Sequence, residues 1–208
     1  MTTTSPPVGA VHKPRGQYAK SAVKRREILD AALEVFAQSG YRAGSLRDVA
    51  QRAGMSEAGL LHHFRNKSVL LEAVLTHRDD RASRIVALDS GDGATIVRGL
   101  VELATYNASI PGLVELYCVL SAEATAPEHP AHRYFIDRYE FIRERVGNAF
   151  RALAVEGRLK NGMTPERAVV VLIALMDGLQ VQWLYDRSIV DMTEALRSTF
   201  SVFVDIEW

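Results

Sequence analysis

The stretch from residue 56 to residue 67 carries side chains suited to contacting nucleic acid. Those in its first half are small or polar, and they offer hydrogen-bond donors and acceptors to base edges. They are Ser56, Glu57, Ala58, Gly59 and His62. Asn66 can cap a following helix, which would place Lys67 and the free amides of its first turn where a phosphate could bind. A helix with such a face can lie close in a DNA major groove, so we predict DNA binding.

The residues around this stretch predict two short helices joined by a tight turn. Apolar side chains recur at helical spacing before the turn, and Ser45 with Asp48 resembles an N-terminal capping box. The recurring residues are Leu46, Val49, Ala50 and Ala53. Gly54 can adopt the positive φ that ends a helix, and Ser56 can cap the next one. This pattern is typical of a helix-turn-helix, although an ordinary pair of solvated helices can also produce it.

Other chemically capable residues give weaker patterns. Glu128, His129 and His132 could ligate a metal, but Pro130 disfavours helix at His129, so the two histidines would not share a helical face. We therefore interpret residues 125–133 as a surface loop and expect neither a metal site nor a cofactor.

Cys118 is the single cysteine, which excludes an intramolecular disulfide in this chain. It falls in an apolar helical run, so we expect a buried, inert thiol rather than a redox sensor.

Residues 25–75 resemble the N-terminal domain of the tetracycline-repressor (TetR) family. The resemblance rests on a helix ending in FAQSGY, the segment SLRDVAQRAGMS, the LLHHF that follows it and the NKSVLL after that. It implies an all-helical homodimer that represses transcription and whose last two helices pair with those of the partner in a four-helix bundle. It also implies a C-terminal ligand domain whose occupancy releases DNA.

The resemblance and the residue types together give one set of candidate DNA contacts. They are Arg25, Ser45, Arg47, Ser56, Glu57, Ala58, Gly59, Leu61, His62, His63 and Lys67. Leu61 departs from the family, because that position is commonly tyrosine, whose hydroxyl meets a phosphate. Leucine cannot make this contact.

Charge is distributed unevenly along the 208 residues. The net charge is zero, but residues 1–70 hold 11 Lys/Arg against 5 Asp/Glu, so the remainder is acidic. A basic head on an acidic body suits a polyanionic partner at one end. Basic residues also lead into the first helix, where they could reach the minor groove or phosphates. They are Lys13, Arg15, Lys20, Lys24, Arg25 and Arg26.

The predicted fold is all-α, with three parts. Residues 1–20 form a disordered basic arm, 21–68 a three-helix DNA-binding domain with the helix-turn-helix, and 69–208 a helical ligand-binding and dimerisation domain. The first helix is expected to stop at Ser39-Gly40, and a long helix with a charged second half, THRDDRASR, to start at Lys67 and join the domains.

The C-terminal half predicts a dimer interface. Residues 165–185 are apolar on almost every side, so that helix must be buried on more than one face. Together with the last helix it holds more apolar surface than one chain can hide. The longest uninterrupted apolar run, residues 168–176, is too short to span a bilayer, and no secretory signal is present. We therefore expect a cytoplasmic protein with no membrane association.

Polar and aromatic groups among the aliphatic residues of this half suggest a pocket for a small molecule, unknown in identity and largely apolar. The candidates are Tyr106, Asn107, Tyr117, Met176, Gln180 and Trp183. A packed core would show the same pattern.

Two other functions compete with a ligand-responsive repressor that binds a palindromic DNA operator. An enzyme is disfavoured, since the chain has no nucleophile elbow, phosphate loop or metal signature. A DNA-binding dimer whose C-terminal domain only dimerises or meets a protein partner remains open.

Overall fold

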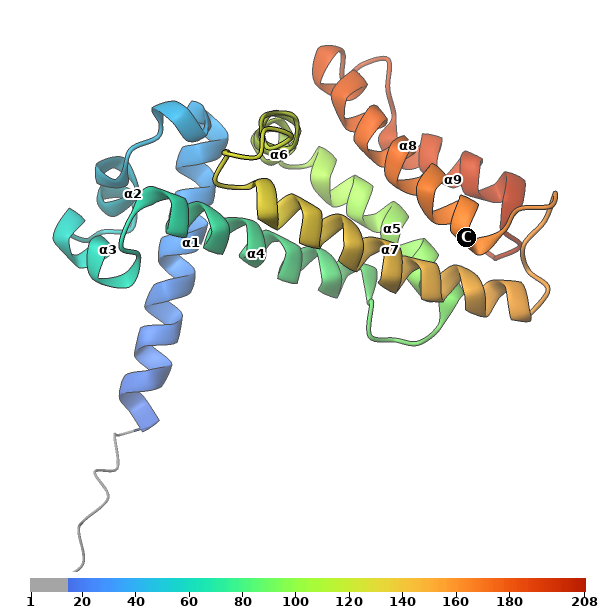
Figure 1. The fold of residues 1–208 in the computed structure, drawn as a ribbon, viewed down its shortest axis with the longest axis horizontal. Coiled ribbons are helices and arrows are strands. Elements are labelled where there is room, and N and C mark those ends of the chain that lie inside the picture. The colour runs from blue at the N-terminus through green and yellow to red at the C-terminus, as the bar shows by residue number, and fades with distance from the viewer. Residues whose placement is uncertain (1–14) are drawn as a thin grey trace, which may run out of the picture.

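A computed structural model describes residues 15–208, with side chains from Ser21 onward, and within that range all regular structure is helical (Figure 1). The predicted all-α class is confirmed. The helices are α1 (Arg15–Ala43), α2 (Leu46–Arg52), α3 (Glu57–His63), α4 (Lys67–Val86), α5 (Gly93–Ala108), α6 (Pro111–Glu123), α7 (His132–Val155), α8 (Pro165–Tyr185) and α9 (Met192–Phe203).

Three side-chain caps start the helices at the N-terminal end as predicted. Ser45 accepts from the backbone N–H of Asp48, whose carboxylate accepts from the backbone of Ser45 in return. Ser56 caps α3 by accepting from Gly59, and Asn66 caps α4 by accepting from the N–H of residue 69. Each cap satisfies a donor that the first helical turn leaves free. These local bonds fix where α2, α3 and α4 begin.

The first helix differs from expectation at both ends. Residues 15–20, assigned to the disordered arm, belong to α1, since Ala, Gln and Lys favour helix there. Residues 1–14, with Lys13, lie outside the described part. The predicted stop at Ser39-Gly40 takes the form of an interruption, because Gly40 has φ 74° and ψ 164°, a positive φ outside the left-handed helical region. One further turn follows and ends at Ala43.

Two apolar cores lie along the molecule. The first is built from α1–α4 together with α6 and the start of α7, and includes Phe36, Phe64, Leu70, Leu120 and Phe135. The second joins the end of α4 to α5, α7, α8 and α9, and includes Val97, Phe150, Leu172, Leu196 and Phe200. The first core crosses the boundary predicted at residue 68, because α6 and α7 complete it.

Helix α8 keeps much of its apolar surface outside both cores. Val170 is 59% exposed, Val181 44% and Tyr185 90%, and Val202 of α9 is 60% exposed. Figure 1 shows α8 and α9 at the opposite end of the molecule from α2 and α3. Within residues 15–208, α8 is also long and apolar enough to cross a bilayer, a property that the count of uninterrupted apolar residues missed. A soluble helix that packs against another subunit has the same composition, so this is weak evidence for a membrane.

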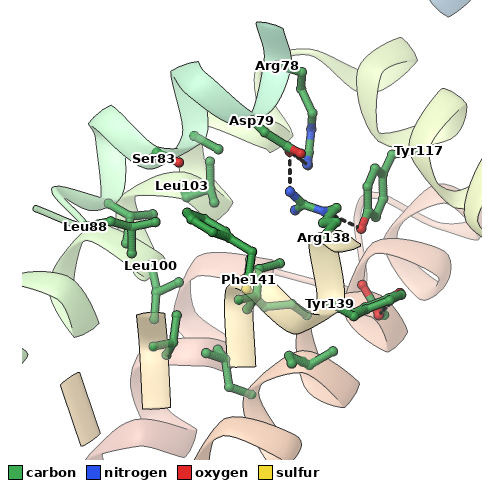
Figure 2. A pocket seen from close by; sticks show the side chains of 18 of the residues that line it. Arg78, Asp79, Ser83, Leu88, Leu100, Leu103, Tyr117, Arg138, Tyr139 and Phe141 are labelled. Atoms are coloured by element: carbon green, nitrogen blue, oxygen red, sulfur yellow. Dashed lines mark hydrogen bonds and ion pairs between the residues drawn. The ribbon is translucent and has the colours of Figure 1, made fainter. Parts of the chain in front are cut away.

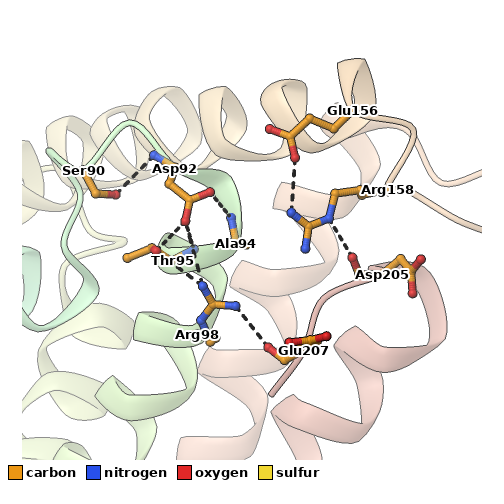
Figure 3. A network of polar contacts seen from close by, with 9 residues as sticks. All are labelled: Ser90, Asp92, Ala94, Thr95, Arg98, Glu156, Arg158, Asp205 and Glu207. Atoms are coloured by element: carbon orange, nitrogen blue, oxygen red, sulfur yellow. Dashed lines mark hydrogen bonds and ion pairs between the residues drawn. The ribbon is translucent and has the colours of Figure 1, made fainter.

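Polar contacts fasten the C-terminal tail to the body (Figure 3). The backbone of Asp205 donates to Arg158 O at 2.9 Å, and Arg158 Nε returns a bond to Asp205 O at 2.8 Å. Arg98 of α5 donates to Glu207 O at 3.0 Å. The ring of Trp208 stacks on Phe200 with an interplanar angle of 9°. The tail thereby covers the end of the second core.

Candidate nucleic-acid interface and ligand cavity

The outward face of α3 is formed by the residues predicted to read DNA. Ser56, Glu57, Ala58, Leu61 and His62 are exposed, while Gly59 and His63 are half-buried. The opposite face anchors the helix, since Leu60 and Phe64 are at most 1% exposed. Arg47 on α2 is exposed and Ser45 half-buried. The structure thus brings the candidates onto neighbouring turns of α2, α3 and α4.

Neighbouring basic residues of α1 make different contacts near this surface. The guanidinium of Arg25 lies 4.3 Å from the ring centroid of Phe64, at the end of α3. Lys24 instead serves the fold, because its ammonium donates to Ala53 O at 2.8 Å at the end of α2. Arg26 is exposed. Of Lys24, Arg25 and Arg26, the two arginines are therefore the ones positioned to contact a polyanion.

Lys67 has a structural role in addition to the phosphate contact predicted for it. Its Nζ donates to Arg42 O at 3.0 Å and lies 4.6 Å from the ring centroid of Tyr41. Burial lowers the pKa of this ammonium from its usual value. One of its three N–H groups is used inside the protein, and the other two can serve a phosphate at the start of α4.

Replacing Lys67 by methionine is expected to weaken binding to operator and random DNA alike. The slope of log Kd against log salt should fall by about one, because one phosphate contact is lost. Stability should also fall, by about 1 kcal/mol, through the bond to Arg42 O and the contact with Tyr41. Salt titrations of both DNAs, with Lys160→Met at the far end as control, measure this. A change in sequence discrimination instead would contradict a phosphate role.

A narrow cavity opens between α4, α5, α6, α7 and α8 (Figure 2). The cavity has a volume of about 80 Å³, within a wider hollow of about 700 Å³ that includes the solvent-open mouth. Apolar residues line one side and polar residues gather at the other. The apolar set includes Leu88, Leu100, Leu103, Val146 and Leu172; the polar set includes Arg78, Asp79, Tyr117, Arg138, Tyr139 and Asp177. Such a lining suits an amphipathic small molecule.

An ion-pair cluster forms the polar end. The Asp79 carboxylate accepts from Arg78 Nη1 at 3.2 Å and also from Arg138 and from the Tyr134 hydroxyl. Arg138 Nε donates to the Tyr117 hydroxyl at 2.8 Å. Arg78 and Arg138 are 7% and 11% exposed. Two nearly buried cations therefore share one carboxylate.

Asp177 is a second carboxylate on the cavity wall and has no cation within ion-pair distance among the described residues. Tyr139 donates to its Oδ2 at 2.8 Å. Burial raises the pKa of Asp177 above its usual value, although the Tyr139 bond, Arg138 and Arg78 act in the opposite direction. A half-buried acid without a cationic partner is sensitive to any charge placed beside it.

Three of the six residues predicted to line the pocket do line the cavity, and three do not. Tyr117, Met176 and Gln180 line the cavity. Asn107 instead faces a small separate void, and Tyr106 accepts from Arg81 at 2.9 Å outside the cavity. Trp183 is buried in the second core. Those three were predicted from residue type alone, which does not fix the direction of a side chain on its helix.

The two histidines of residues 125–133 make contacts within the protein. His129 Nε2 lies 3.7 Å from Glu123, His129 Nδ1 accepts from the N–H of Ala131, and His132 lies 2.7 Å from Ala124 O. Among the described residues no three potential ligands are grouped as a metal would require. These contacts close the turn between α6 and α7.

Cys118 is half-buried and not fully buried as predicted. Its thiol is still expected to react slowly with thiol reagents. Burial raises the pKa of its thiol to about 11, with Asp177 adding to the effect and Arg78 opposing it. At neutral pH the thiolate fraction should be roughly 100-fold below that of an ordinary cysteine. Labelling of the native protein compared with the denaturant-unfolded protein measures this; equal rates would contradict an inert thiol.

Comparison with known proteins now identifies the chain. The model for "Bacterial regulatory proteins, tetR family" matches residues 28–74, and that for "BetI-type transcriptional repressor, C-terminal" matches residues 113–205. The chain belongs to the TetR family of transcriptional regulators. The predicted resemblance to the TetR family and the predicted helix-turn-helix are confirmed. So is the prediction of a transcriptional regulator and not an enzyme.

Individual TetR-family proteins are similar over different lengths. TtgR, an HTH-type transcriptional regulator of Pseudomonas putida, is 27% identical over 181 residues, covering 81% of this chain and 83% of TtgR. The HTH-type transcriptional repressor Rv1474c of Mycobacterium tuberculosis is 40% identical over 72 residues, only 35% of this chain and 37% of that protein. NalD, the secondary repressor of the MexAB-OprM multidrug efflux pump in Pseudomonas aeruginosa, superposes with a TM-score of 0.67 and 25% identity over 91% of this chain and 100% of NalD.

Proposed function

We propose that this TetR-family regulator is a repressor that binds a palindromic operator as a homodimer and releases it when a small molecule occupies the cavity. One observation carries the proposal. Only three residues separate the end of α3 from the start of α4, and the second half of α4 contributes Arg78, Asp79, Ala82, Ser83 and Val86 to the cavity wall. A molecule that displaces this wall therefore moves α4, the helix that directly follows α3. Helix α3 is the second helix of the helix-turn-helix and is here called the recognition helix.

A second connection runs through α6. Tyr117 lines the cavity, while its neighbours Leu116 and Leu120 pack in the first core with α1. Gly112 lies so close to α1 that a Cβ there would be 2.9 Å from Ala37 O. The cavity thus touches two helices that contact the DNA-binding part. An effector shifts the equilibrium only by its preference for one arrangement of these helices.

The homodimer would form through the exposed apolar surfaces of α8 and α9, which one chain leaves uncovered. Two recognition helices held in this way could meet half-sites about one helical turn apart, roughly 34–36 Å. If an effector changes that separation, both half-sites can no longer be met together and affinity falls. A cytoplasmic location without membrane association follows from this use of α8.

Within each half-site we assign different tasks to the candidate residues. Ser56, Glu57, Ala58, Gly59 and His62 would face base edges, and Arg25, Ser45, Arg47, His63 and Lys67 would face the phosphate backbone. Leu61 is exposed and packs against neither core, so it can contact DNA only through apolar groups.

The narrowness of the cavity favours one alternative, a DNA-binding dimer with no small-molecule ligand. In that case α7 and α8 would simply pack around a space too small to fill, and the C-terminal part would serve dimerisation or a protein partner.

The first test is selection of random duplex DNA by the purified protein, followed by sequencing. A palindromic consensus with half-sites one helical turn apart would support the repressor and supply a probe for effectors. Absence of any enrichment at low salt would exclude DNA recognition. Release of the selected operator by no member of a chemically diverse effector collection would favour the ligand-free dimer.

Glu57→Ala should change the preferred sequence at one position of each half-site, because a glutamate can accept from a cytosine amine in the major groove. Discrimination at that position should fall by about 1–3 kcal/mol, while affinity for random DNA stays within about twofold. Repeating the selection with this variant measures both. Equal losses on every sequence would contradict base reading by Glu57.

A further inference from the structure

The polar end of the cavity offers more free hydrogen-bond donors than acceptors. Asp79 already accepts from Arg78, Arg138 and Tyr134, so its carboxylate has little remaining capacity. The Tyr117 hydroxyl accepts from Arg138, and the Tyr139 hydroxyl donates to Asp177. The acceptors of Asp79 are therefore largely used, and the free carboxylate capacity at this end lies mainly on Asp177, which accepts only from Tyr139 among the described residues.

The guanidinium groups are not used up in the same way. Each has five N–H donors, of which Arg78 gives one and Arg138 two to the described residues. No buried side-chain nitrogen or oxygen in the described part lacks a partner. The remaining guanidinium nitrogens must therefore reach accessible space. Since both side chains are almost fully buried and line the cavity, that space is the cavity itself.

Of the three aromatic rings that line the cavity, those of Tyr117 and Phe141 already carry a cation, whereas none lies over the ring of Tyr139 among the described residues. Arg78 lies 4.3 Å and Arg138 5.1 Å from the ring centroid of Tyr117, and Arg145 lies 5.5 Å from that of Phe141. A ligand ammonium would normally be held by such faces, but at Tyr117 and Phe141 it would meet guanidinium charges instead.

The remainder of the cavity is mainly apolar, with Ser83 beside the leucines. Figure 2 shows Leu88, Leu100 and Leu103 on the side away from Arg78 and Tyr117, with Phe141 between the two ends. The small cavity volume, about 80 Å³, favours a slender chain over a broad ring system.

We propose that the effector is a slender amphiphile whose carboxylate head is held by Arg78 and Arg138 and whose hydrocarbon tail lies along the leucine side. A carboxylate is planar and has two oxygens, the geometry that a guanidinium fork binds best. Asp177 lies on the same wall as the opposing charge, and it weakens binding of an anion while ionised. This inference rests on the proposed function of the cavity as the effector site.

The test compares three molecules with the same tail, namely decanoate, 1-decanol and decyltrimethylammonium, below their micelle-forming concentrations. Binding is followed by calorimetry and by the fluorescence of Trp183 and Trp208. Decanoate is expected to bind roughly tenfold or more tighter than decanol, because the charge-assisted bonds are absent in the alcohol. Decyltrimethylammonium is expected to bind more weakly than either.

Two variants test the roles of the charges. Arg138→Gln should weaken decanoate roughly tenfold and leave decanol almost unchanged, whereas Arg133→Gln, an exposed arginine on the same helix, should change neither. Asp177→Asn keeps the size of the side chain and its bond from Tyr139 but removes the opposing charge. It should tighten decanoate several-fold and weaken decyltrimethylammonium further.

The two charge variants predict opposite shifts, so a general loss of folding cannot imitate the expected result. If circular dichroism shows that Arg138→Gln is unfolded, the change in decanoate affinity caused by Asp177→Asn alone tests the carboxylate assignment. Preference for the ammonium, weakening of decanoate by Asp177→Asn, or no binding of any of the three would overturn the carboxylate assignment. Each of these outcomes leaves the repressor standing if operator selection succeeds, whereas failure of operator selection removes the repressor whatever the ligands do.

Discussion

Alanine at position 99 is expected to lower the free energy of unfolding by about 2 kcal/mol and to weaken operator binding at the same time. A Cβ on Gly99 would lie 2.6 Å from Val86 Cα and 2.7 Å from Val86 O. Backbone atoms cannot rotate away, so α4 and α5 must separate. Because α4 leads directly from the recognition helix, the separation displaces the DNA-binding surface as well as the packing.

Thermal unfolding and operator titration of Gly99→Ala measure both effects. The midpoint should fall by about 4–8 °C for a chain of this size. Gly147→Ala is the matched control, since a Cβ there would meet only the tip of the flexible Arg151 side chain at 3.4 Å. The control should be neutral or slightly stabilising, because alanine favours helix over glycine. Equal midpoints for the two variants would contradict a close α4–α5 contact.

Glutamate at position 181 is expected to convert the protein to a monomer and to reduce operator affinity roughly 100-fold or more. Val181 is 44% exposed on the apolar side of α8, where a dimer would bury it. A charge there would have to be desolvated without a partner. A monomer binds each half-site separately and loses the gain in effective concentration that links them.

Light scattering gives the oligomeric state of Val181→Glu, and titration with full and half operators gives the affinity. Half-site affinity should be unchanged. Val119→Glu is the control, because Val119 is a similarly exposed valine, at 50%, but belongs to α6 and not to the helices proposed to form the interface. A dimeric Val181→Glu protein with normal operator affinity would exclude this face as the interface.

Local chemistry made the N-terminal end predictable from the sequence. The caps at Ser45, Ser56 and Asn66 all form as expected, because each depends on a bond from a backbone amide three residues away. Gly54 adopts the positive φ predicted for the turn, at 63°. Such features need no information from distant parts of the chain.

The polar end of the cavity could not be predicted in this way. Arg78 and Asp79 lie in the charged run THRDDRASR, which is predicted from the sequence as the second half of a helix joining the domains and not as part of the cavity. Their burial depends on Arg138 and Tyr134 of α7, about 55–59 residues further along the chain. Charged residues are seldom buried without partners, so their position becomes evident only once the partners are placed. The expectation of a largely apolar effector therefore omitted the end that carries the charges.

The first core has a consequence for how this regulator could be recombined with others. Leu116, Leu120 and Phe135 from α6 and α7 complete the packing around α1 and α4. In a hybrid protein that takes α1–α4 from this chain and the rest from a relative, Phe36 and Leu70 would pack against the relative's side chains or lose their packing partners. The portable unit is consequently not the helix-turn-helix alone but that element with the segments that cover it. Exchange of recognition specificity between relatives should succeed by grafting surface residues of α3 and fail by exchanging whole N-terminal segments.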